Sequence, residues 1–297
     1  MNKILLYTAI GDAIGAGYEF TYKKVKSFDD IKGYNPHPKR KNSPKDIGVY
    51  TDDTHMSIGN AIALIELFGY KKLNNFNTAQ IKRLFADNYL AVYRFNPRTG
   101  YAKGFQSLLE SLKKHGTGQT LIDKIQKHGK SDRNGAAMRA VVLGYLPLGV
   151  LSEITRIQSS VTHNDAGNYA ASIISLLSYY LKVMDKERAY KALSLVYPNA
   201  FLYGRELPPC PVSGIKTVAI ALELFYRNNN LKDLIIDAIN VTGDVDSLLA
   251  ITCGLAAWPN SGYDLTLPQW CFDNLEDGLL GRSYINVLDS QLYNAFK

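Results

Sequence analysis

Two short acidic stretches decide how this chain is read: Thr51-Asp52-Asp53-Thr54 and Gly243-Asp244-Val245-Asp246-Ser247. We call them the first and the second acidic cluster. Each stands directly before an apolar run with helical spacing, and almost two hundred residues separate them. If both clusters serve one site, the two halves of the chain must share one core.

Taken alone, each cluster fits an ordinary helix N-cap, because Asp, Ser and Thr satisfy the free amide groups of a first turn and complement the helix dipole. Asp246 or Ser247 would cap the helix that runs to Trp258. Two adjacent aspartates nevertheless exceed what a cap needs, and a cation best relieves their repulsion. Carboxylate and hydroxyl oxygens are the ligands that Mg²⁺ and Mn²⁺ prefer. The two clusters together therefore favour a metal site.

The composition is that of an ordinary globular protein, with 46% hydrophobic and 21% charged residues. The net charge of +7 fits an anionic ligand, and part of the excess lies in one basic loop, Lys39-Arg40-Lys41 to Lys45. No nucleic-acid-binding motif accompanies the charge, so we expect no nucleic acid partner. Three cysteines without a CxxC pair indicate a reducing compartment, and no apolar run could cross a bilayer. We expect a cytoplasmic protein without a membrane partner.

Apolar residues recur mostly at helical spacing, and clean two-residue alternation is nearly absent. This pattern predicts an all-α fold, a single compact multi-helix domain over residues 1–297. The expected helices cover the ranges 58–68, 79–93, 166–184, 215–226, 231–240 and 247–258, with a further helix that starts at Met138 and runs to Leu146.

Several other motifs have both a structural and a functional interpretation. The small residues of Gly11–Gly17 suit close packing of a first helix, where Asp12 would need a buried partner. Glu19 follows them and is open to either a structural or an acid–base role. Two glycine-bearing segments, 98–105 and 132–139, precede helices, where backbone amides bind anions but also simply form turns. His163 is either a ligand contact or a capping residue.

In this order the motifs resemble the ADP-ribosylglycohydrolase family, which includes the dinitrogenase-reductase-activating glycohydrolases and the ADP-ribosylarginine hydrolases. The resemblance spans essentially the whole chain. It rests on both acidic clusters and on these segments: Gly11-Asp12 through Glu19, His55-Met56, Gly100-Tyr101, Asn134-Gly135-Ala136-Ala137-Met138-Arg139 and Thr162-His163.

The resemblance implies a cleft with two Mg²⁺ or Mn²⁺ ions at its floor. The implied metal ligands are Thr51, Asp52, Asp53, Asp244, Asp246 and Ser247. The implied catalytic residues are Glu19, Asp52, Asp53 and Asp246, one of which passes a proton to the leaving group. The implied substrate-binding residues are Gly100, Tyr101, Lys103, Gly104, Asn134, Gly135 and His163.

The chain departs from the family's usual residues at four of these positions. Val245 and Ser247 replace two threonines of the second cluster, and Ser247 keeps the oxygen donor. Ala102 and Arg133 replace glycines next to the expected substrate loops. These changes bear on substrate fit more than on metal binding.

The function implied is hydrolysis of the N-glycosidic bond between ADP-ribose and a protein side chain, most commonly arginine. The expected partners are an ADP-ribosylated protein, ADP-ribose and an ADP-ribosyltransferase, and the protein is expected to be a monomer. Two alternatives stay open. One is an ADP-ribose-binding or immunity-type protein that neutralises a transferase without catalysis. The other is a di-metal nucleotide phosphohydrolase, which would release phosphate or AMP.

Overall fold

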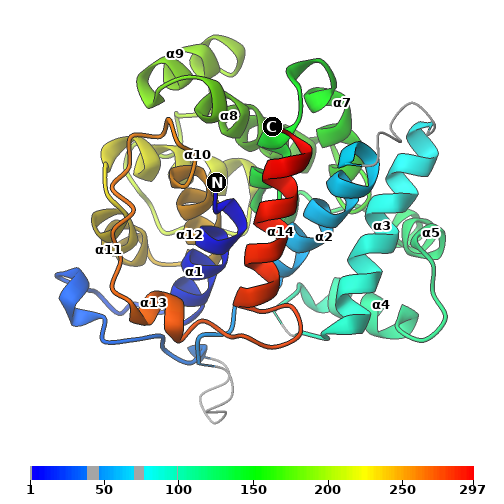
Figure 1. Ribbon diagram of the computed structural model, residues 1–297, viewed down its shortest axis with the longest axis horizontal. Helices are drawn as coiled ribbons and strands as arrows, with labels where there is room; N and C mark the ends of the chain where they lie inside the picture. The colour runs from blue at the N-terminus through cyan, green and yellow to red at the C-terminus, as the bar shows by residue number, and fades with distance from the viewer. Residues whose placement is uncertain (1, 39–46, 70–76, 99) are drawn as a thin grey trace.

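Two helices from distant parts of the sequence, α1 (Ile4–Ala16) and α12 (Val245–Ala256), pack side by side at the centre of the molecule (Figure 1). Every residue of both helices is buried. The helices approach closely because Gly11 and Gly15 face α12: a Cβ atom on Gly15 would lie 2.5 Å from the Asp246 Cα, and one on Gly11 would collide with the Leu249 carbonyl. The small residues of the first helix thus serve packing, as the sequence predicts.

The computed structural model describes residues 2–38, 47–69, 77–98 and 100–297. Within these ranges the chain forms helices joined by loops, with isolated β-bridges and no strand. The remaining α-helices are α2 (Asp52–Leu64), α3 (Thr78–Phe95), α4 (Lys103–Leu112), α5 (Gly118–His128), α6 (Gly135–Met138), α7 (Leu148–Ser159), α8 (Asp165–Val183), α9 (Lys186–Val196), α10 (Gly214–Arg227), α11 (Leu231–Val241), α13 (Trp270–Asp273) and α14 (Arg282–Ala295). The predicted all-α single domain is confirmed.

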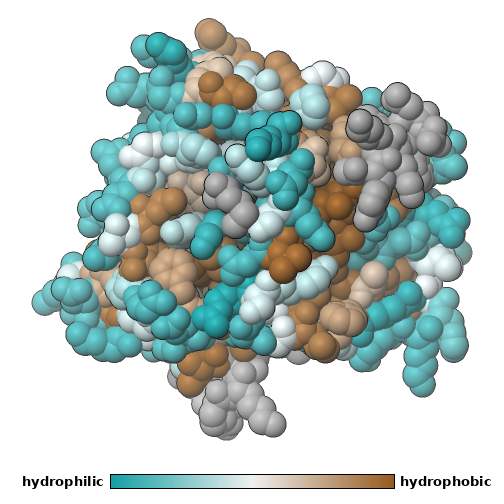
Figure 2. All heavy atoms as spheres, viewed as in Figure 1, coloured by the Kyte–Doolittle hydropathy of each residue, from teal (hydrophilic) through white to brown (hydrophobic). Residues whose placement is uncertain are grey.

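The other helices surround the central pair. α14 packs against α1 and α2, while α10 and α11 cover the far side of α12. α3, α4 and α5 form a separate edge of the molecule, opposite α9 and α11 (Figure 1). Hydrophilic side chains cover that outer edge on the face drawn in Figure 2. Among the described residues, no helix combines the length and the apolar character needed to cross a membrane.

The predicted helix over Met138–Leu146 is wrong. The four-residue helix α6 ends at Met138, and a 3-10 helix over Val141–Tyr145 follows it. Two features explain the difference: a Cβ on Gly144 would collide with Ser178 of α8, and Pro147 begins the next element. The segment is buried on all sides, so its apolar spacing carries no helical period. The basic loop from Lys39 to Lys45 lies outside the described residues.

Candidate functional site

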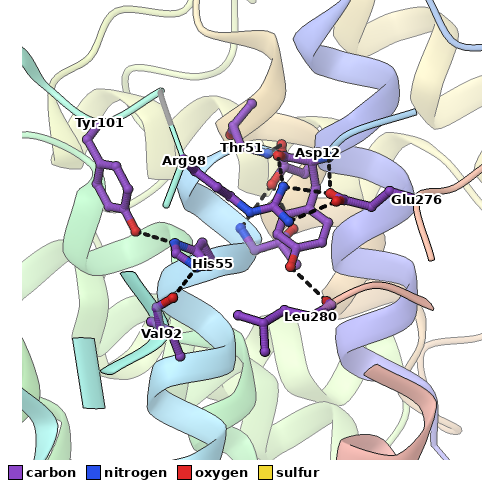
Figure 3. Close-up of polar contacts among 10 residues, drawn as sticks. Asp12, Thr51, His55, Val92, Arg98, Tyr101, Glu276 and Leu280 are labelled. Atoms are coloured by element: carbon purple, nitrogen blue, oxygen red, sulfur yellow. Dashed lines mark hydrogen bonds and ion pairs between the residues drawn. The ribbon is translucent and has the colours of Figure 1, made fainter. Parts of the chain in front are cut away.

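The first acidic cluster begins α2, but its aspartates do not cap that helix. Thr51 is the N-cap residue and makes no side-chain capping bond. Instead Asp12 of α1 reaches across: its carboxylate accepts from the Thr51 and Thr54 amides, at 2.8 and 2.9 Å, and from the Thr54 hydroxyl at 2.6 Å (Figure 3). This is the buried partner that the sequence demands for Asp12. Because a neighbouring helix provides the cap, Asp52 and Asp53 are left for another role.

The second acidic cluster is shaped by its backbone. Thr242 and Gly243 have left-handed φ values of 68° and 85°. A Cβ on Gly243 would collide with the Cys210 carbonyl, which accepts from the Asp244 amide at 3.0 Å, so only glycine fits this turn. α12 therefore starts at Val245, with Asp244 as an N-cap residue that makes no side-chain capping bond. The capping interpretation fails here too.

The two clusters meet at one place. Carboxylate oxygens of Asp12, Asp53 and Asp246 lie within 4.8 Å of one another, and so do those of Glu19, Asp244 and Asp246. Asp246 belongs to both groups because Gly15 lets it press against α1. The structure thus forms two adjoining acidic groups that share one aspartate.

One carboxylate oxygen in this floor has no partner. Asp53 Oδ2 accepts from the Thr51 hydroxyl at 3.0 Å, whereas Asp53 Oδ1 is buried without a hydrogen bond. Asp244 Oδ2 accepts from the Asn134 amide at 2.9 Å. A buried carboxylate oxygen that lacks a donor is costly, and a cation is the partner that such a set of hard donors fits.

The raised pKa values of the buried carboxylates also favour a bound cation. Burial, followed by the charge of Asp12, raises the pKa of Asp52 to about 7. Burial also raises the pKa of Asp12 to about 6, against the hydrogen bonds that it accepts. For Asp53 and Asp246, burial and neighbouring carboxylates hold the pKa well above its usual range. So many carboxylates cannot ionise together unless positive charge joins them.

The acidic floor opens into a cleft of about 990 Å³. Of the residues that the sequence assigns to the site, all but Thr51 line this cleft: Glu19, Asp52, Asp53, Gly100, Tyr101, Lys103, Gly104, Asn134, Gly135, His163, Asp244, Asp246 and Ser247. Thr51 is buried beside the cleft and donates its hydroxyl to Asp53. The structure therefore brings together residues from most of the chain.

His163 forms part of the cleft wall as a neutral ring. Gly135 and Gly167 both pack against it, since a Cβ on either would lie 3.0 Å or less from the imidazole side chain. Its Nδ1 lies 2.7 Å from the Thr162 hydroxyl, which accepts from Arg139 at 2.9 Å. Burial and the Arg139 charge lower the pKa of His163 to about 3. The ring can exchange hydrogen bonds with a ligand but carries no charge.

Tyr101 is fixed on the cleft wall by a second neutral histidine (Figure 3). His55 Nε2 donates to the Val92 carbonyl at 3.0 Å, so Nδ1 accepts from the Tyr101 hydroxyl at 2.6 Å. Burial and the Arg98 charge lower the pKa of His55 to about 3, which favours this neutral form. Gly100 precedes Tyr101 with φ 134°, and a Cβ there would lie 2.8 Å from Asp52 Oδ1. The loop therefore lies directly against the first acidic cluster.

A partly buried ion pair that the sequence did not reveal supports this region (Figure 3). Arg98 donates to both carboxylate oxygens of Glu276, at 2.6 and 2.9 Å, and to the Tyr50 carbonyl at 2.8 Å. Its guanidinium also lies over the Tyr50 ring, 3.7 Å from the centroid. Arg98 begins the glycine-bearing segment 98–105, so its place near the site could have been predicted from the sequence. Glu276 lies 178 residues away in a loop that carries no local signal.

The domain is all-helical, and carboxylates converge on the floor of its cleft. These two features define a class of proteins suited to bind cations and an anionic ligand. The comparisons identify the family. The sequence model of the ADP-ribosylglycohydrolase family matches residues 3–297, so this chain belongs to that family.

Two other proteins are similar to this chain over nearly its whole length. An uncharacterized protein of Archaeoglobus fulgidus is 24% identical over 317 residues, which cover 98% of this chain and 95% of the other. A solved structure described as an ADP-ribosylglycohydrolase-related protein complex has a TM-score of 0.69 at 23% identity, and covers 99% of this chain and 97% of that chain. At this identity the structural likeness supports the fold alone.

Proposed function

We propose that the protein is a divalent-metal-dependent hydrolase that removes ADP-ribose from a modified protein side chain, with arginine as the side chain. The observation that carries the proposal is the convergence of both acidic clusters on one floor, where Asp53 Oδ1 is buried without a donor. Family membership supports ADP-ribose as the group that is removed.

The residues that would hold two Mg²⁺ or Mn²⁺ ions are Asp52, Asp53, Asp244, Asp246 and Ser247, with Thr51 behind them. Such ions supply Lewis-acid chemistry: they acidify water and orient hydroxyl groups of a bound sugar. Asp12 belongs to the same oxygen cluster, but its hydrogen bonds to Thr51 and Thr54 assign it to holding the first cluster in place.

Hydrolysis needs one water oxygen to attack the anomeric carbon of the ribose while the carbon–nitrogen bond breaks and the nitrogen takes up a proton. Glu19 is suited to move that proton. It lines the cleft, shares the acidic floor with Asp244 and Asp246, and contacts His37 through its Oε2. The neutral walls formed by Tyr101 and His163 would bind the rest of the ligand without competing for the metal.

The start of α4 suits the pyrophosphate. Its N-cap residue, Ala102, has no side chain that could cap the first amides, and Lys103 and Gly104 line the cleft at this helix start, where an anion would bind. The Asn134–Gly135 segment lines the same cleft.

The proposal is tested by incubating an arginine-ADP-ribosylated protein with the enzyme in Mg²⁺ or Mn²⁺, and again in EDTA, and separating the nucleotide products by chromatography. Metal-dependent release of intact ADP-ribose is expected. Release of AMP or phosphate would instead indicate a nucleotide phosphohydrolase. Tight ADP-ribose binding without release from any linkage would indicate an immunity-type binding protein.

A further inference from the structure

One side of the cleft mouth is strongly basic. It is formed by α4, α5 and the loop 129–134, and we call its cations Lys103, Lys124, Lys127, Lys130 and Arg133 the basic rim. Lys103, Lys124 and Arg133 line the cleft itself, whereas Lys127 and Lys130 are exposed beside it. The rim is therefore the part of the surface that a macromolecule would meet when its modified side chain entered the cleft.

The segment that contains the rim, together with Lys113 and Lys114, carries much of the excess charge of the whole chain. Residues 101–135 contain seven Lys and Arg against three Asp and Glu, a surplus of four, and the chain as a whole has a net charge of +7. The basic surface extends beyond the rim to Lys82. Burial lowers the pKa of Lys82, and the nearby charges of Lys130 and Arg156 lower it further.

The rim cations are not neutralised by the protein. Among the described residues, none of the five lies within 4.0 Å of a carboxylate oxygen; the ion pair in the same segment joins Lys113 and Glu110, which are not part of the rim. Lys124 has a weak hydrogen bond to the Ser111 hydroxyl at 3.4 Å. Unpaired charge of one sign around a cleft attracts a partner of the opposite sign and raises its rate of association.

The chemistry of the rim favours an acidic protein over a nucleic acid. Asp123 precedes Lys124, and Asp132 stands between Lys130 and Arg133, so acids interrupt the row of cations that a phosphate backbone would follow. The aromatic residues next to the rim are also withdrawn from solvent, with Tyr101 buried and Phe105 half-buried, so they offer no stacking platform for bases.

We propose that the basic rim docks an acidic surface patch of the ADP-ribosylated protein substrate, and so selects among modified proteins by charge. The inference rests on the proposed function, because that function places a modified protein at the cleft mouth. The rim acts on the body of the substrate protein, while the acidic floor and the cleft walls act on ADP-ribose.

The test compares three substrates: ADP-ribosyl-arginine, and two arginine-ADP-ribosylated proteins of matched size with opposite net charge. The variant is Lys127→Glu/Lys130→Glu, which leaves the cleft lining intact. The matched control is Lys191→Glu/Lys232→Glu on α9 and α11, opposite the rim (Figure 1). kcat/KM is measured at low and at moderate salt.

For the wild type we expect a preference for the acidic protein that salt weakens, since screening shortens the reach of surface charge. The rim variant should lose roughly tenfold in kcat/KM on the acidic protein at low salt, mainly through KM. It should keep its activity on ADP-ribosyl-arginine, and the control variant should behave as the wild type.

Two results would overturn the inference while leaving the proposed function intact: an unchanged kcat/KM of the rim variant on the acidic protein, or an equal loss on ADP-ribosyl-arginine. Stronger inhibition of turnover by a single-stranded oligonucleotide than by the unmodified acidic protein would also overturn the inference. That result would indicate a nucleic acid partner. A wild type that releases ADP-ribose from none of the three substrates would contradict the proposed function itself.

Discussion

The first acidic cluster is held by side chains that arrive from distant parts of the chain, whereas the second is held by its own backbone. Asp12 caps α2 from α1, and the pair Arg98–Glu276 braces the neighbouring loop. At the second cluster a distant side chain, Asn134, contacts only Asp244, and the turn itself depends on the left-handed Gly243 pressed against Cys210. Removal of charge should therefore disturb the first cluster most, and an increase in side-chain size should disturb the second.

The largest effect should come from breaking the floor that the clusters share. Asp53→Asn and Asp246→Asn keep the side-chain shape but remove one ligand charge each, and each should lower kcat/KM by roughly 10³-fold or more. If the clusters form one site, the double variant should be hardly worse than either single one. Asp29→Asn, on an exposed residue, is the control. Full activity in either single variant would refute a shared metal floor.

The brace of the first cluster should show mainly in stability. Arg98→Ala leaves Glu276 partly buried without its cation, and we expect the free energy of unfolding to fall by about 3 kcal/mol. Urea unfolding in EDTA measures this without a contribution from metal. Arg188→Ala breaks an exposed ion pair and should change stability by less than about 1 kcal/mol. Equal effects of the two substitutions would show that Arg98–Glu276 is no brace.

The backbone of the second cluster can be probed with a matched pair of glycines. Gly243→Ala should lower the free energy of unfolding by about 2 kcal/mol, because a Cβ strains a left-handed residue and meets Cys210. Gly262 has a similar φ of 73°, but nothing lies within 4 Å of its Cβ position, so Gly262→Ala should cost less. A comparable loss at both sites would mean that backbone conformation alone matters.

The smallest expected effect concerns the first cluster and Asp12, the side chain that holds it in place. The folded-state pKa of Asp52 is about 7 and that of Asp12 about 6, both above the ordinary 3.8. Without metal, their contribution is present at low pH and is lost as the pH rises through about 6 to 7. Bound metal favours the ionised forms, so the melting temperature gained from Mg²⁺ or Mn²⁺ should be several degrees larger at pH 8 than at pH 5.5. A gain independent of pH would contradict this electrostatic picture.

Much of the fold followed from the sequence because helical apolar spacing reports helices directly. The spacing identified α3, α8, α10 and α11 nearly to their ends. It failed at Val141–Tyr145, where burial on every side removes the contrast between faces and only the contact of Gly144 with α8 explains the 3-10 turns.

Most of the acidic floor was readable from sequence because four of its carboxylates stand in two local pairs, Asp52 with Asp53 and Asp244 with Asp246. The residues that support the floor could not be predicted in the same way. Neither Glu276 nor His55 stands in a pattern that announces its partner, since the pairing of Arg98 with Glu276 and of His55 with Tyr101 arises only from the tertiary fold. The assignment of Asp12 was intermediate: the sequence showed that it needed a buried partner, and the structure identified Thr51 and Thr54 as that partner.

The packing of α1 against α12 also determines when the acidic floor can form during synthesis of the chain. Asp246 reaches the floor only by pressing against Gly15, which leaves the ribosome roughly 230 residues earlier. Until α12 has emerged, α1 lacks the neighbour that covers its buried face, and the floor lacks the aspartate common to both oxygen groups. The nascent chain therefore has no complete floor until α12 has been synthesised, because the contact that completes the floor joins two distant parts of the chain.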